Sequence, residues 1–301
     1  MSQLTSSSSD PNLLGMGTLA HLHWEDYEPD FEQVEDARPR DAMVDTAKEA
    51  LRQFFEVERR QVFYKRQLQV IFEDRFFHWI TDRALTELAA EGHIAEDTEE
   101  FPVIQHMTFY RAKTHRFWKR QAAEIAELVQ RFSDPEFTRA LGAHGEQMFD
   151  AALPRFGFMP VGTKVRSYDG KTWVETGHDL DRVFVRDGVA YGAEIKNTLK
   201  YIPRDELTAK LKMCKFLGLR PLFIVRFAPK SYNFEVFEEG GFTLVIKHQL
   251  YPFGQKTFAD EVKERLRLPT DSPARISDGT VERFLRWHTA SLERVAEEPR
   301  E

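Results

Sequence analysis

The segment Gly177–Asn197 constrains the fold more than any other part of the chain, because two β-rich runs in it flank an Asp-Gly dipeptide at 187–188. Asp-Gly favours a two-residue type I′ turn, so this segment predicts a β-hairpin. In the register that such a turn sets, Asp181 lies opposite Glu194. Side chains alternate between the two faces of a strand, so Lys196 shares a face with Glu194.

The predicted pair of carboxylates needs a cation. Side chains directly opposite each other have Cβ atoms about 4.5–5.5 Å apart, where like charges destabilise the hairpin. A divalent ion such as Mg²⁺ or Mn²⁺ suits the pair, because hard cations prefer oxygen ligands. The sequence has no Cys or His cluster with zinc spacing, which also favours an oxygen-bound metal. Lys196 beside the ion would orient or help deprotonate a water, or stabilise charge on a phosphate.

A third carboxylate, Glu146, is predicted to reach the same site. Apolar residues recur at helical spacing along 137–153, and Glu146, three residues before Phe149, falls on the apolar face of that helix. A carboxylate on such a face is costly to bury without a partner, and a metal-bound water would serve. The alternative for the whole segment is a surface hairpin with a Glu-Lys salt bridge and a helix acid that is satisfied without a metal.

Residues 140–228 resemble the core of the PD-(D/E)xK nuclease superfamily, which includes restriction endonucleases and archaeal Holliday junction resolvases. The order in that family is a helix with an acid, a strand, a strand with Asp, a strand with Glu-x-Lys, a helix and a strand. Glu146, Asp181 and Glu194-Ile195-Lys196 match the acids and the lysine. The other elements are expected as a strand near Phe158–Val165, a helix from about Pro203 to Leu217 ended by Gly218, and a strand at Pro221–Phe227.

The resemblance implies an α/β fold with a restriction-endonuclease-like αβββαβ core and a mixed central sheet. It also implies that Asp181, Glu194 and the backbone carbonyl of Ile195 bind Mg²⁺ or Mn²⁺, and that Lys196 is the catalytic lysine. Glu146 would then contact a ligand of the metal ion rather than the ion itself, or it would bind a second metal ion. Leu180 stands where the family often has Pro. This departure leaves Asp179 as an alternative ligand to Asp181, although the hairpin register favours Asp181.

The N-terminal half predicts a different module. Three apolar stripes at helical spacing lie between residues 46 and 91. Helices followed by a hairpin are the order of a winged helix-turn-helix, and His78–Ile94 resembles the recognition helix of that family. The resemblance implies that Arg83 and Thr86 face a DNA groove. The strands are expected at Val103–Ile104 and Met107–Tyr110, joined to the helices through the acidic stretch Glu96–Glu100.

The stretch from Phe101 to Ala123 contains no acid. Its basic side chains are candidates for phosphate contacts, which release counterions from nucleic acid. Its aromatic side chains either stack on bases or enter the core, and the sequence leaves both alternatives open. The basic residues are Arg111, Lys113, Arg116, Lys119 and Arg120, and the aromatic residues are Phe109, Tyr110, Phe117 and Trp118.

The net charge of -7 is unevenly distributed. Residues 1–50 carry 11 acids and 3 bases, whereas 51–301 carry 38 acids and 39 bases, so the excess of acidic residues lies within the first 50 residues. We expect an acidic flexible arm at 1–42, acting as a solubilising tail or as a self-inhibitory or partner-binding segment. The winged-helix region and a connector helix are expected at 43–132, and the nuclease-like domain with a C-terminal extension at 133–301.

The sequence therefore predicts a Mg-dependent endonuclease that hydrolyses DNA, with a possible homodimer to cut two strands. A lone cysteine, Cys214, and the lack of a signal peptide or a run of eighteen apolar residues favour a cytoplasmic protein without a membrane segment. Two alternatives stay open. One is a DNA-binding regulator or scaffold with a non-cleaving nuclease-like fold, and the other is a nuclease acting on RNA or branched DNA.

Overall fold

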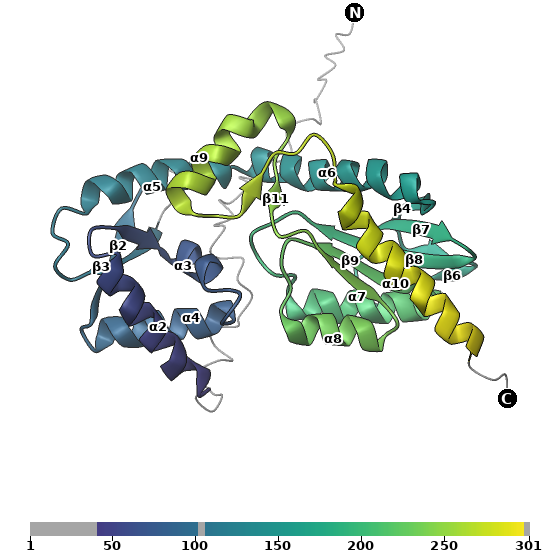
Figure 1. Cartoon of the computed structure of the whole chain (residues 1–301), viewed down its shortest axis with the longest axis horizontal. Helices are drawn as coiled ribbons and strands as arrows, with labels where there is room; N and C mark the ends of the chain where they lie inside the picture. The colour runs from purple at the N-terminus through teal and green to yellow at the C-terminus, as the bar shows by residue number, and fades with distance from the viewer. Residues whose placement is uncertain (1–40, 102–105, 298–301) are drawn as a thin grey trace, which may run out of the picture. The chain divides into compact units, whose positions relative to one another are not determined.

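Apolar residues recurring every three or four positions fold the first described part of the chain into helices that share one core. A computed structural model describes residues 41–101 and 106–297 (Figure 1). The predicted arm at 1–42 therefore lies almost wholly outside the described residues, as does the strand expected at Val103–Ile104. The three helices are α2 (Met43–Val57), α3 (Lys65–Ile71) and α4 (His78–Ala90).

A three-stranded antiparallel sheet accompanies these helices. Its strands are β1 (Val62–Tyr64), β2 (Ile94–Glu100) and β3 (His106–Ala112), in the order β1-β3-β2. The prediction that Glu96–Glu100 is a connecting segment is wrong, because these acids form most of β2. Their side chains are accommodated since only Ile94 is buried, while Asp97 accepts a hydrogen bond of 2.9 Å from Arg111 on β3.

The central sheet is mixed, and the structure is of the α/β class. Its strand order is β10-β9-β8-β7-β4, with β4, β7 and β8 antiparallel and β8, β9 and β10 parallel. The strands are β4 (Met159–Val165), β7 (Leu180–Arg186), β8 (Val189–Lys196), β9 (Arg220–Val225) and β10 (Phe242–Val245).

Helices cover both faces of this sheet (Figure 1). On one face, α6 (Pro135–Ala152) and α10 (Asp278–Glu297) bury Phe149 and Phe284 against residues such as Ile195. On the other face, α7 (Arg204–Leu217) and α8 (Lys230–Glu238) cover the sheet. Because side chains alternate along β8, Ala193 and Ile195 face α6 while Glu194 and Lys196 face α7.

The remaining elements are short or lie at the edges of these layers. Asp134 begins α6 by accepting hydrogen bonds from the next amides, as the Asp-Pro pair predicts. None of the helices in the described residues is both long and apolar enough to cross a lipid bilayer. The remaining helices and strands are α5 (Lys119–Phe132), η1 (Leu153–Phe156), β5 (Ser167–Tyr168), β6 (Lys171–Thr172), β11 (Gln249–Leu250), η2 (Phe253–Gln255), α9 (Lys256–Leu266) and β12 (Thr270–Asp271).

A buried charged cluster links the loop before α4 to the end of β9. Arg226 is only 2% exposed, and its guanidinium binds both carboxylate oxygens of Glu73, with Nη2 at 2.6 Å from Oε2. His78 lies 3.4 Å from the same carboxylate through Nε2, and its ring stacks on Tyr201 with 3.9 Å between centroids. Burial lowers the pKa of His78 to about 4, against a smaller opposing effect of Glu73, while Arg66 and Arg226 add to the lowering.

The free energy of unfolding should fall as the pH drops below neutrality, and protonation of His78 should account for a measurable share of that fall. Above pH 6.5 the imidazole is neutral in both states, but between about 6.5 and 4 only the unfolded chain takes up the proton. The free energy of unfolding should therefore drop by about 3 kcal/mol over this window. Urea titrations at several pH values on wild type and His78→Gln measure this share, since the variant lacks the titrating group. Parallel pH profiles for the two proteins would refute it.

Candidate active site

The hairpin β7–β8 has the predicted register. Asp187 and Gly188 both have positive φ, 50° and 75°, as a type I′ turn requires. The pairs run from Arg186↔Val189 to Arg182↔Ala193. Asp181 and Glu194 are the next residues outward, and Asp181 Oδ2 accepts a hydrogen bond of 2.7 Å from the amide of Ile195. The hairpin thus brings Asp181, Glu194 and Lys196 together at one end of β8.

Glu194 is almost completely buried, at 1% exposure, and both of its carboxylate oxygens bind a lysine. Lys196 Nζ lies 2.9 Å from Oε1 and Lys210 Nζ lies 2.5 Å from Oε2. Lys196 also contacts Glu206 at 2.8 Å. The site is therefore a cluster of three carboxylates and two ammonium groups, in which α7 contributes Glu206 and Lys210.

Sequence reasoning did not assign Lys210 or Glu206 to this site. A lysine on an amphipathic helix is more often solvated than buried. The available signal was spacing, because Glu206 and Lys210 are four residues apart and share one face of α7. Lys210 is nevertheless only 3% exposed.

Both acids of the hairpin have raised pKa values, chiefly because they are buried. Burial raises the pKa of Asp181, against lowering by the Ile195 amide and by both lysines. Burial and the charge of Asp181 raise the pKa of Glu194. Burial alone would lower the pKa of Lys196, but the Glu194 and Glu206 carboxylates outweigh it and raise this pKa. Positive charge near Asp181 and Glu194 therefore stabilises the ionised forms of both acids.

Glu146 has an ion-pair partner within the protein. Its carboxylate forms a salt bridge of 3.0 Å with Arg182, which also binds Asp150 at 2.8 Å. Arg182 alternates with Asp181 along β7 and turns toward α6, so it supplies the cation that Glu146 needs. Glu146 still lies near enough to Asp181 for its charge to raise the pKa of that acid.

Two features of the alternative are present, since Glu194 contacts Lys196 and the helix acid Glu146 is satisfied by Arg182. The site is nevertheless not a surface hairpin, because Glu194 is buried. α7 covers this face of β8, where the buried Lys210 of that helix contacts the Glu194 carboxylate. On the opposite face, α6 approaches the end of β8 closely. Gly145 leaves no room for a side chain there, since a Cβ would lie 2.7 Å from that of Asn197.

The donor set fits a hard divalent cation in type. Asp181, Glu194 and the carbonyl of Ile195 offer oxygen atoms only, and Mg²⁺ is commonly held by one or two carboxylates plus waters and substrate phosphate. Within residues 41–101 and 106–297, no group of three His, Cys, Asp or Glu side chains is arranged to hold a metal ion. The two acids would therefore hold the cation with ligands from outside the chain.

Three of the four aromatic side chains interleaved with these basic residues belong to the core. Phe109, Tyr110 and Trp118 are 0%, 2% and 6% exposed, whereas Phe117 is 90% exposed. Arg111 is also committed to the fold, because it binds Asp97, the carbonyl of His115 and the face of Trp118.

The other basic residues of this stretch are at the surface. Lys113 and Arg116 are exposed beside Phe117. Lys119 pairs with Glu99 at 3.1 Å and Arg120 with Glu124 at 3.1 Å, both in exposed ion pairs of the kind that contribute little to stability. These four side chains remain available to a phosphate backbone.

The predicted groove-facing residues of α4 have acidic surroundings. Arg83 Nε lies 3.3 Å from Glu87, one turn along the same helix. Thr86 is exposed and its hydroxyl donates to the carbonyl of Asp82. Glu91 at the end of α4 adds another carboxylate, which binds Lys48. The surface of α4 thus carries more negative than positive charge, which disfavours close phosphate contact there.

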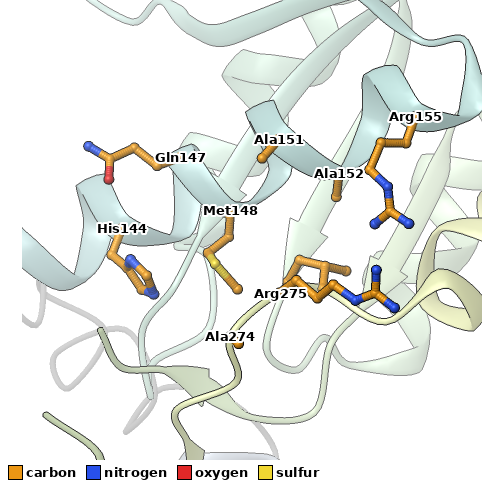
Figure 2. A pocket seen from close by; sticks show the side chains of 9 residues that line it. His144, Gln147, Met148, Ala151, Ala152, Arg155, Ala274 and Arg275 are labelled. Atoms are coloured by element: carbon orange, nitrogen blue, oxygen red, sulfur yellow. The ribbon is translucent and has the colours of Figure 1, made fainter. Parts of the chain in front are cut away.

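A pocket of about 430 Å³ lies apart from the acids, between α6 and the segment 274–276. Figure 2 shows the Met148 side chain extending from α6 toward the segment that carries Ala274, with the guanidinium groups of Arg155 and Arg275 near each other at one end. Arg155 is tied to Asp278 at 2.8 Å. The pocket contains none of the predicted site residues.

Comparison with known proteins gives no match: no family model, no curated protein and no solved structure is significantly similar to this chain.

Proposed function

We propose that this protein is a metal-dependent nuclease that hydrolyses phosphodiester bonds in DNA. The single observation that carries the proposal is the convergence of Asp181, Glu194 and Lys196 at one end of β8, with Glu194 buried. Two opposed carboxylates in a buried position are destabilising unless a cation serves them. Burying two acids together costs more free energy than an ordinary structural salt bridge requires, whereas the same arrangement suits a metal site.

The order of the elements supports the same proposal. The run α6, β4, β7, β8, α7, β9 has the αβββαβ order expected of a restriction-endonuclease-like core, interrupted only by the small hairpin β5–β6. The run α2, β1, α3, α4, β2, β3 agrees with a winged helix-turn-helix. The proposal assigns hydrolysis to the first run, and DNA contact to the exposed basic side chains that follow β3 of the second run.

In this proposal each side chain has a defined task. Asp181 and Glu194 hold the cation, together with the carbonyl of Ile195. The bound Mg²⁺ supplies Lewis-acid activation of the phosphate and of the attacking water. Lys196, which is about one-third exposed, holds its positive charge beside the phosphate and positions the water. Arg182 keeps Glu146 and Asp150 paired, which fixes α6 behind the site.

A cleavage panel tests the proposal. The purified protein is mixed with duplex, single-stranded and branched DNA and with RNA, with Mg²⁺, Mn²⁺ or EDTA. We expect metal-dependent cleavage of at least one DNA substrate. Binding without cleavage under every metal condition would favour a regulator or scaffold, and cleavage confined to RNA would change the substrate class.

Phe117 should contact nucleic acid directly. A Phe side chain with 90% exposure between Arg116 and Lys119 has the arrangement of a stacking residue in a basic loop. Stacking contributes about 1–3 kcal/mol per base, so Phe117→Ala should weaken binding to single-stranded DNA by about 5- to 150-fold. Fluorescence anisotropy at low salt measures the loss. Phe117→Trp should keep the affinity, and Phe234→Ala, at another exposed Phe, should not change it. Equal affinities for wild type and Phe117→Ala would exclude the contact.

A further inference from the structure

Lys210 is a buried lysine whose ammonium group joins both acid-bearing strands. It lies 2.5 Å from Glu194 Oε2 on β8, and it donates to the backbone carbonyl of Asp179, which precedes β7. Its side chain is only 4% exposed. Burying an ammonium group costs several kcal/mol, so a position of this kind needs partners as close as these two.

The two lysines at Glu194 differ in how they are held. Lys196 is about one-third exposed and divides its contacts between Glu194 and Glu206. Lys210 has its partners inside the protein and lies on the buried face of α7. An incoming cation can therefore replace Lys196 at Oε1 at little cost, because Glu206 retains Lys196. Replacing Lys210 at Oε2 would leave a buried ammonium group without its carboxylate.

We infer that Lys210 is a positioning residue that permanently occupies Glu194 Oε2, so that Glu194 offers only Oε1 and the site takes a single divalent cation. Lys210 then supplies the charge that a second cation would otherwise bring to Glu194. Its bond to the Asp179 carbonyl also fixes the start of β7, two residues before Asp181. This inference rests on the proposed metal site and adds its stoichiometry and its supporting residue.

Binding of Mn²⁺ alone tests the inference without any cleavage assay. The loss of the free Mn²⁺ signal in electron paramagnetic resonance gives stoichiometry and Kd for the full chain. Wild type should bind one ion per chain at this site, and Asp181→Asn should abolish that binding. Lys210→Met should raise the Kd about 10- to 100-fold, the usual effect of removing a group that orients a metal ligand. Lys212→Met, an exposed lysine on the same helix, should bind as wild type does.

Three results would overturn the inference. Two ions bound per wild-type chain and lost together in Asp181→Asn would contradict the single-cation site, whether or not Lys210→Met folds. A wild-type Kd in folded Lys210→Met would show that Lys210 has only a structural role. In both cases metal binding by wild type would leave the proposed nuclease function intact. Absence of any Mn²⁺ binding by wild type would instead remove the metal site itself, and the inference with it.

Discussion

Asp181→Asn should lower the rate of DNA cleavage by about 10³-fold or more while leaving DNA affinity unchanged. The substitution keeps the shape of the side chain and an oxygen that can accept from the Ile195 amide. It removes the negative charge that holds the cation, and Lewis-acid stabilisation by a bound metal contributes several kcal/mol to a phosphoryl transition state. Single-turnover cleavage of a labelled duplex, with anisotropy for binding, separates the two effects.

The matched control is Asp169→Asn, which makes the same chemical change in the exposed turn between β5 and β6. This variant should cleave at the wild-type rate. Lys196→Met should also lose most activity, because no other ammonium group of the cluster is exposed to substrate as Lys196 is. Wild-type cleavage by Asp181→Asn would mean that the hairpin acids are not the active site.

Glu73→Gln should cost about 3–5 kcal/mol of the free energy of unfolding. The substitution removes the negative charge that faces the buried guanidinium of Arg226, which would keep only neutral acceptors, namely one amide oxygen and the carbonyls of Thr198 and Leu199. An uncompensated buried charge is the costly result of breaking such a pair. Small domains have about 5–15 kcal/mol of stability in total, so the loss is large.

Equilibrium unfolding in urea measures this loss, and two further variants define its origin. Glu239→Gln makes the same change in the exposed pair with Lys215, at 3.2 Å, and should change stability by about 0–1 kcal/mol. Glu73→Gln combined with Arg226→Met should be more stable than Glu73→Gln alone, because it removes the orphaned charge. Equal stability of wild type and Glu73→Gln would show that the pair is not buried in solution.

The hairpin was predictable because its information is local. The Asp-Gly turn determines the register by itself, and the register then places Asp181 beside Glu194. The ends of α6 and α7 were predictable for the same reason, through Asp134 and Gly218. By contrast, β1 has only three residues, and such a short run carries no usable periodicity.

The partners of the site residues were not predictable, because they depend on which helix covers which face. Alternation along β8 turns Glu194 toward α7, where Lys210 meets it, and alternation along β7 turns Arg182 toward α6, where it binds Glu146. A single sequence specifies these alternations but not the side on which each helix packs. The same limit applies to the aromatic residues near Phe117, whose burial is decided by the three-stranded sheet.

The most direct test of the nuclease proposal is cleavage of DNA by the wild-type protein with Mg²⁺ or Mn²⁺, measured beside EDTA and beside Asp181→Asn. The proposal predicts cleavage that requires the metal, stops on chelation and is absent from the variant. Failure of wild type to cleave any DNA substrate with either metal, or cleavage that persists in EDTA or in Asp181→Asn, would contradict it.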